Sequence, residues 1–184
     1  MPYKAPSPSN AWTCTLNQSA VSADQSQPFQ LTFGDELVFN LDKIASGFIK
    51  KLYGNKTLSS VDAFKEKDGE FYFIEFKNQP QKNIDSNSVR AKAFSSLVVL
   101  QFALHPELSL AEISEKAHFY VVFQDDPQNY FEKTTQTIAK YAGFSDEPIY
   151  FDLRKYYFNN KLYKDIHTVS FSVFESKYIG LIFP

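Results

Sequence analysis

Apolar residues in the first third of the chain are spaced as on one side of an amphipathic helix. They recur at intervals of three and four residues, which is the repeat of a helix with one buried face. Thr32-Phe33-Gly34-Asp35 offers a capping start and Gly54-Asn55 an end. The sequence therefore predicts a helix over residues 35–53. Its apolar stripe is formed by Leu37, Leu41, Ile44, Phe48 and Leu52.

A β-hairpin is predicted directly after this helix. Residues 58–65 and 70–77 have the composition and alternation of strands, and Asp68-Gly69 lies in the connection between them. Side chains alternate faces along a strand. Glu75 and Lys77 should therefore share the face of Phe71 and Phe73.

The remainder of the chain alternates helical and strand patterns. A second helix is predicted over residues 88–105, closed by Pro106, with an apolar side formed by Ala91, Phe94, Leu97, Val98 and Gln101. Strands are expected at 117–124, 149–153 and 167–174, and a further helix at 130–141. This order describes an α/β domain with a mixed central sheet flanked by helices.

The expected organisation is one domain preceded by an arm. Residues 1–30 are rich in Ser, Gln, Pro and Asn, which predicts a flexible or loosely docked arm with a short strand near residues 11–16. Residues 31–184 form the single domain, with a core at about 35–124 and a C-terminal elaboration at 125–184.

Composition and charge exclude several classes of protein. The net charge of −2 argues against a protein that coats nucleic acid, although residues 43–92 hold ten basic and six acidic residues. The single cysteine, Cys14, excludes an internal disulfide and a cysteine-built zinc site. The sequence shows neither a secretory signal nor a membrane span, so we expect a cytoplasmic protein without a membrane partner.

The chemistry centres on Asp62, Glu75 and Lys77. A carboxylate and an ammonium group at the end of an apolar strand face are costly to bury unless each is paired. A divalent metal held by Asp62 and Glu75, with Lys77 beside its bound water, would supply that pairing.

This arrangement resembles the PD-(D/E)xK nuclease superfamily. The resemblance covers about residues 35–124 and consists of a helix, an Asp on one strand of a hairpin, Glu-x-Lys on the next strand, then a helix and a strand. It implies a restriction-endonuclease-like core of the kind also found in Holliday-junction resolvases. Val61 stands where the family motif has proline. The short motif itself is degenerate, so the resemblance depends on the order of the elements.

The resemblance also implies roles for individual residues. Asp62 and Glu75 would bind Mg²⁺ or Mn²⁺, and Lys77 would orient or activate the attacking water. Glu36, near the start of the first helix, would be an additional acidic residue of the site, with Asn40 or Asp42 as alternatives. The implied activity is metal-dependent hydrolysis of a phosphodiester bond, with DNA as the first expectation and homodimer formation left open.

Several alternatives remain at this stage. Arg90 and Lys92, at the start of the second helix, are candidates for contacting nucleic-acid phosphate. Glu75 and Lys77 would instead be ordinary surface charges if their strand lay exposed at the sheet edge. His105, His118 and His167 lack metal-ligand spacing in the sequence and are expected to be isolated. The rival to a nuclease is a catalytically inactive module that binds nucleic acid or protein.

Overall fold

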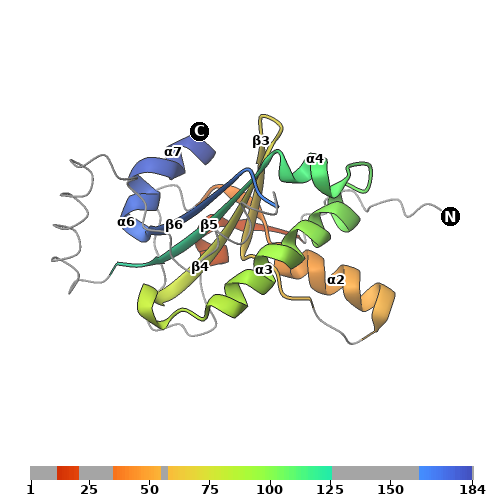
Figure 1. Cartoon of the computed structure of the whole chain (residues 1–184), viewed down its shortest axis with the longest axis horizontal. Helices are drawn as coiled ribbons and strands as arrows, with labels where there is room; N and C mark the ends of the chain where they lie inside the picture. The colour runs from red at the N-terminus through yellow and green to blue at the C-terminus, as the bar shows by residue number, and fades with distance from the viewer. Residues whose placement is uncertain (1–11, 21–34, 55–57, 126–161, 184) are drawn as a thin grey trace.

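A six-stranded mixed sheet forms the centre of the protein. The computed structural model describes residues 12–20, 35–54, 58–125 and 162–183. Neighbouring strands follow one another in chain order across the sheet, antiparallel from β1 to β4 and parallel from β4 to β6 (Figure 1). The strands are β1 (Thr13–Thr15), β2 (Leu37–Phe39), β3 (Ala63–Lys67), β4 (Glu70–Pro80), β5 (Ala117–Gln124) and β6 (Asp165–Ser170).

The predicted hairpin is present, although its first strand begins at Ala63 and not at residue 58, so Asp62 lies just before the strand. The turn explains the register of the hairpin. β3 and β4 pair from Lys67 opposite Glu70 to Ala63 opposite Ile74. The two residues between them both have positive φ, 53° at Asp68 and 79° at Gly69. A two-residue turn of this kind matches the twist of antiparallel strands and favours an Asp-Gly pair.

We expect Gly69→Ala to destabilise the protein by about 1 kcal/mol, because an L-residue is strained at this φ. Gly47→Ala is the matched control. Gly47 lies within a helix, has open space where a Cβ would stand, and should gain stability on substitution. Urea unfolding measures both variants. Equal free energies of unfolding for Gly69→Ala and the wild type would contradict the turn assignment.

The first helix begins later than predicted. α2 spans Leu41–Tyr53 and Asn40 caps it, with the Asn40 side chain accepting a hydrogen bond from the Lys43 backbone N–H at 2.9 Å. The preceding residues form β2, which pairs with β1 and β3. Leu37 is 61% exposed and is not part of the helix stripe. The prediction of helix over residues 35–40 is therefore wrong, because strand pairing there replaces the local helical pattern.

The second helix is present, but its buried side differs from the predicted one. α3 spans Ser86–Val99, is capped by Asp85, and continues through a π-helical turn, η3 (Leu100–Leu104), before Pro106. Phe94 is 54% exposed. Leu97 is buried as predicted, and three of the six buried residues are small, which lets the helix approach the sheet closely. The buried residues of α3 are Val89, Ala93, Ser95, Ser96, Leu97 and Val99.

Helices cover both faces of the sheet, so the core has two parts (Figure 1). One face packs against α2 and α3 and includes Phe73 and Phe119. The other includes Ile74 and Tyr120 and packs against α1 (Leu16–Ala20) and the C-terminal helical segment. That segment comprises α6 (Phe171–Val173), the π-helical turn η6 (Phe174–Tyr178) and α7 (Ile179–Ile182). The predicted α/β class with a mixed sheet flanked by helices is confirmed.

The two ends of the described chain add to this core. We expected residues 1–30 to form a flexible or loosely docked arm with a short strand near residues 11–16. The short strand is present as β1, but α1 follows it and Leu16 is fully buried, so residues 13–20 are part of the core. The strand predicted at 117–124 is β5. The last predicted strand is shorter than expected, since β6 ends at Ser170 and a helix follows.

Two predicted elements, the helix at 130–141 and the strand at 149–153, lie outside the described residues. A short helix, α4 (Leu110–Ser114), precedes β5 and was not predicted, although Ser109 and Glu112 form a capping box at its start. Within the described ranges, none of the helices is long and apolar enough to cross a membrane.

Candidate functional site

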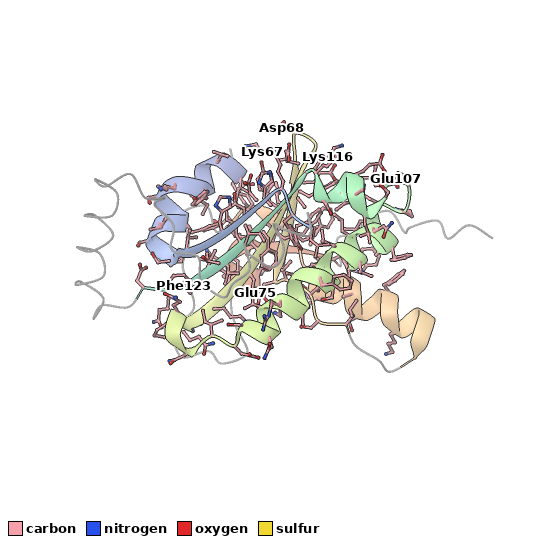
Figure 2. The ribbon with its side chains drawn as sticks, viewed as in Figure 1. Lys67, Asp68, Glu75, Glu107, Lys116 and Phe123 are labelled. Atoms are coloured by element: carbon pink, nitrogen blue, oxygen red, sulfur yellow. The ribbon has the colours of Figure 1, made fainter. Side chains whose placement is uncertain are left out.

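Glu75 and Lys77 lie on β4, which is a central strand and not an edge strand. β3 pairs with one side of β4 and β5 with the other. Glu75 is fully buried, on the sheet face that packs against α3. Figure 2 shows Glu75 far along β4 from Lys67 and Asp68 at the hairpin tip. The alternative of a solvent-exposed edge strand is therefore wrong, and the buried carboxylate requires positively charged partners.

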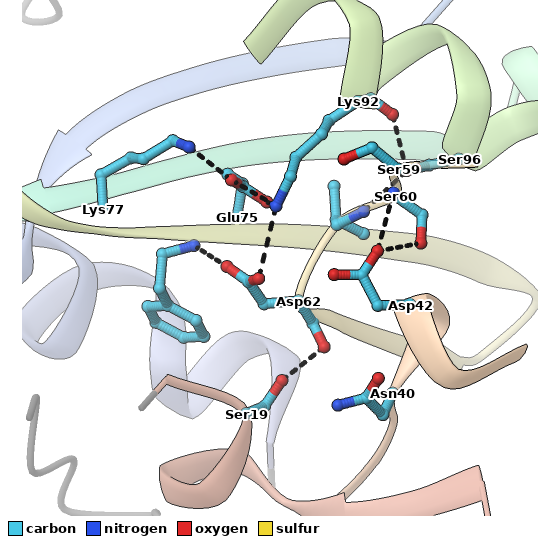
Figure 3. A network of polar contacts seen from close by, with 12 residues as sticks. Ser19, Asn40, Asp42, Ser59, Ser60, Asp62, Glu75, Lys77, Lys92 and Ser96 are labelled. Carbon is cyan, nitrogen blue, oxygen red and sulfur yellow. Dashed lines mark hydrogen bonds and ion pairs between the residues drawn. The ribbon is translucent and has the colours of Figure 1, made fainter. Parts of the chain in front are cut away.

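Two lysines supply that charge. Lys77 Nζ lies 2.8 Å from Glu75 Oε1. Lys92 Nζ reaches from α3 to both oxygens of the same carboxylate, at 2.9 Å from Oε1 and 2.9 Å from Oε2 (Figure 3). The Lys92 side chain is only 14% exposed. Lys92 was expected to contact phosphate at the helix start, but in the structure it contacts the buried carboxylate.

Asp62 joins this group from the residue immediately before β3. Its Oδ2 accepts a hydrogen bond from the Phe76 backbone N–H at 2.7 Å, and its Oδ1 lies 3.5 Å from Lys92 Nζ. Both acidic side chains thus have an oxygen within 3.5 Å of one nitrogen atom. The structure therefore brings Asp62, Glu75 and Lys77 together, and adds Lys92 to them (Figure 3).

The approach of the chain to Asp62 is fixed by hydrogen bonds from α3. The buried Ser96 hydroxyl donates to the Lys92 carbonyl at 2.7 Å and accepts from the Val61 backbone N–H at 3.0 Å. Ser95 donates to the Ser59 carbonyl. Small hydroxyl side chains thus join the backbone before Asp62 to the helix turn that carries Lys92. This contact fixes the separation of Lys92 and Asp62 and explains why α3 is lined with serines at this point.

Two further side chains hold the same segment from the opposite direction. Asp42, in the first turn of α2, accepts hydrogen bonds from the backbone N–H and the hydroxyl of Ser60, each at 2.8 Å. The Ser19 hydroxyl, from α1, donates to the Asp62 carbonyl. Three helices therefore converge on residues 59–62, so Asp62 is presented in a fixed position.

Of the three candidates for an additional acidic or amide residue, Asp42 lies nearest to the site. Its charge is close enough to raise the pKa of Asp62 further, after the larger effects of burial and Glu75. Asn40 is committed to capping α2. Glu36 precedes β2, and its carboxylate lies 3.9 Å from Lys65 Nζ. Lys65 pairs with Tyr72, on the sheet face opposite Glu75, so Glu36 does not point toward the site as expected.

Asp62 and Glu75 lie close together where little water reaches them, so the charge of Glu75 disfavours the ionised form of Asp62. Burial, followed by the negative charge of Glu75, raises the pKa of Asp62 from 3.8 to about 8, although Lys92 and the Phe76 N–H oppose this shift. Burial lowers the pKa of Lys92, but the charges of Asp62 and Glu75 outweigh burial and raise it above its ordinary value. A further cation near Asp62 would favour the ionised carboxylate.

The raised pKa of Asp62 predicts a pH-dependent stability that Asp62→Asn removes. Between pH 3.8 and about 8 the folded protein holds a proton that the unfolded chain releases, so the free energy of unfolding should fall as pH rises through this window. Because Asn cannot ionise, the free energy of unfolding of Asp62→Asn should depend less on pH. Its advantage in stability over the wild type should be largest near pH 8. Urea unfolding of both proteins across this pH range, in the presence of EDTA, measures the two slopes.

Asp35→Asn is the matched control, because Asp35 is exposed and lies before β2. It should retain the wild-type slope. A wild-type slope in Asp62→Asn as well would show that another group is responsible.

The donor set fits a divalent cation with oxygen ligands. Glu75 Oε1 is buried and, among the described residues, receives no hydrogen bond of acceptable geometry, although two ammonium nitrogens lie within 2.9 Å of it. It is thus held by charge alone. Two carboxylates fixed near a common point are what Mg²⁺ and Mn²⁺ bind in proteins. Asp62 and Glu75 would hold the ion, provided that Lys92 Nζ moves away from between them.

Arg90 lies on α3, two residues before Lys92. Its guanidinium donates to the Asn87 side chain. Lys92 contacts the two acids because it lies on the side of α3 that packs against the sheet, which was not the predicted buried side. The sequence does hold a signal for this orientation. Lys92 and Ser96 are four residues apart and therefore lie on the same side of the helix, next to the small buried residue Ala93.

Comparison with known proteins adds no relative. No family model matches the sequence, and no curated protein or solved structure is significantly similar to it.

Proposed function

We propose that the protein is a metal-dependent nuclease that hydrolyses a phosphodiester bond, with DNA as the first candidate substrate. The observation that carries this proposal is the fully buried Glu75, which shares Lys92 with Asp62 and has Lys77 at 2.8 Å. Burying two acids next to each other costs stability, and such arrangements are concentrated at functional sites.

The order of elements supports a restriction-endonuclease-like core within this proposal. α2 is followed by the hairpin of β3 and β4, then by α3 and by β5 parallel to β4. Asp62 stands at the start of the hairpin and Glu75-Phe76-Lys77 on its second strand. This is the order described for the PD-(D/E)xK superfamily, and the α/β architecture alone does not distinguish its members from other functions.

Each side chain has a part in the proposed reaction. A divalent ion held by Asp62 and Glu75 would supply Lewis-acid stabilisation of phosphate charge and a water of lowered pKa. Lys77, 18% exposed, has its ammonium group 2.8 Å from the Glu75 carboxylate, so it would be placed to hydrogen-bond the attacking water and hold it in line. Lys92, released from between the acids, adds positive charge beside the scissile phosphate.

The test is cleavage of a labelled panel that contains single-stranded, duplex and branched DNA and a matched RNA. Reactions contain Mg²⁺ or Mn²⁺, with EDTA as the blank. We expect at least one substrate to be cut in the presence of either ion and none with EDTA. Glu75→Gln, prepared in parallel, should be inactive because a ligand charge is lost. Equal cleavage by wild type and Glu75→Gln would identify a contaminating nuclease and overturn the proposal.

A second candidate function has its own supporting observation. Lys92 already contacts both acids, and Lys77 contacts Glu75, without a metal, as they would in a module that keeps the fold and binds nucleic acid or protein without chemistry. This reading predicts that the wild type binds panel members without cutting them. It also predicts that binding is unaffected by Mg²⁺ and by Glu75→Gln.

A further inference from the structure

A second polar cluster lies on the opposite face of the sheet from Glu75. The parallel pairing of β5 and β6 places His118 opposite Asp165 and Tyr120 opposite His167. Residues two apart on a strand share a face, so His118, Asp165 and His167 all lie on the face of Tyr120. Tyr120 belongs to the core part that α1 and the C-terminal helices cover. The sheet itself therefore separates this cluster from the site around Glu75.

The three side chains are close enough to share one ion. One ligand atom from each lies within 4.8 Å of those of the other two. His118 Nδ1 is 3.5 Å from Asp165 Oδ2. In a tetrahedral zinc site, bonds of about 2.0 Å place the ligand atoms about 3.3 Å apart. Asp165, whose side chain is 48% exposed, can rotate to adjust its distance to the two imidazole nitrogens.

The ring nitrogen of His118 that faces away from Asp165 contacts a carboxylate, as is common for histidine metal ligands. Its Nε2 lies 3.0 Å from Glu70 Oε2, on the neighbouring strand β4. Lys164 Nζ holds the other oxygen of Glu70 at 2.8 Å and, by hydrogen bonding, lowers the pKa of that carboxyl. When Nε2 carries the proton and donates a hydrogen bond to Glu70, Nδ1 keeps its lone pair on the side of Asp165. This carboxylate–histidine arrangement is the usual outer shell of protein zinc sites.

Aromatic neighbours fix both imidazole planes. His118 stacks on Tyr72, with ring centroids 5.1 Å apart and planes inclined by 12°. His167 stacks on Tyr120 at 4.6 Å and 18°, and also contacts Tyr178 at 4.9 Å. The rings are thus held by the sheet and by the C-terminal helical segment before any ion arrives, which reduces the entropy lost on binding.

We propose that His118, Asp165 and His167 form a binding site for a transition-metal ion of the Zn²⁺ class. Two imidazole nitrogens and one carboxylate oxygen suit Zn²⁺, Co²⁺ or Ni²⁺, and three protein ligands leave a position for water or another ligand. Mg²⁺ prefers an all-oxygen set and should not compete here. The proposal is independent of the nuclease assignment, since no residue is shared with the site around Glu75.

The test is titration of metal-free protein with Zn²⁺ by calorimetry, together with the visible absorption of bound Co²⁺. The wild type should bind one ion at this site, and its Co²⁺ spectrum should be that of a low-coordinate nitrogen and oxygen site. His167→Ala and Asp165→Asn should each weaken Zn²⁺ binding by about 100-fold, and Glu70→Gln by about 10-fold or more. Asp165→Asn alters a half-exposed side chain, so it remains informative if His167→Ala unfolds.

Two controls define the outcome. His105→Ala removes a histidine that contacts Glu66 and Glu107 and lies 5.1 Å from the Phe71 ring, and it should leave the affinity unchanged. Glu75→Gln should also bind Zn²⁺ here as the wild type does. Failure of the wild type to bind Zn²⁺, or wild-type affinity in both Asp165→Asn and His167→Ala, would overturn the proposal whatever the nuclease assay shows.

Discussion

Lys77→Ala should reduce cleavage by at least about 100-fold while leaving the fold and the affinity for Mn²⁺ intact. The proposed part of Lys77 is to hold the attacking water, and the loss of one positioned donor in a hydrolytic site costs about this much. Lys77 is not a proposed metal ligand, so the transition state loses more than the ground state does. Glu75 keeps Lys92 at 2.9 Å, so the carboxylate does not become an unpaired buried charge.

Lys116→Ala is the matched control, because Lys116 is exposed at the start of β5, away from Glu75 (Figure 2). Both variants are assayed for cleavage of one labelled substrate, and for Mn²⁺ binding by calorimetry. Wild-type cleavage by Lys77→Ala would remove the nuclease mechanism as stated and favour the binding module.

Lys92→Met should give the largest loss of stability of any single substitution in the site. Met fills a similar volume, but it leaves Glu75 and Asp62 without the ammonium group they share. Breaking a buried ion pair by removing one partner costs about 3 kcal/mol. Thermal and urea unfolding in EDTA measure the loss. Saturating Mg²⁺ should restore more stability to Lys92→Met than to the wild type, because a bound ion would replace the missing charge.

A double variant separates lost charge from lost packing. Glu75→Gln in the Lys92→Met background removes the buried negative charge that Lys77 alone would otherwise balance, so it should recover more than half of the lost stability. Lys116→Met serves as the surface control and should be close to neutral. If Glu75→Gln made Lys92→Met less stable still, the charge-pairing account of the site would be wrong.

The parts of the fold that could be predicted from sequence are those fixed by neighbours in the chain. The hairpin was predictable because Asp68-Gly69 adopts the positive φ values that its turn requires. The shared face of Glu75 and Lys77 followed from strand alternation alone. Local pattern was therefore enough to place the acid and the lysine together.

Prediction failed where tertiary pairing or small residues decided the structure. Leu37 fits a helical interval, yet it lies in β2 because β1 and β3 pair with that segment. In α3 the larger apolar residue Phe94 is exposed, while Ala93 and Ser96 face the sheet. Counting apolar residues favours the wrong side of such a helix. Where a helix packs closely against a sheet, a small side chain fits better than a large apolar one.

The remaining site features depend on pairings that no local pattern encodes. Lys92 reaches Glu75 because α3 is bonded through Ser96 to the backbone at Val61. His118 and His167 were expected to be isolated, but parallel pairing of β5 with β6 brings them together. Sequence spacing says little about ligands on separate parallel strands, because the crossover between such strands has no fixed length.

Calorimetric titration of Mn²⁺ into EDTA-treated wild type, Glu75→Gln and Lys92→Met tests most directly whether Asp62 and Glu75 form a divalent-metal site. The account predicts one bound ion in the wild type, loss of that binding in Glu75→Gln, and tighter binding in folded Lys92→Met, where Lys92 no longer competes for the two carboxylates. Equal Mn²⁺ affinity in the wild type and Glu75→Gln, or no binding to the wild type, would contradict it.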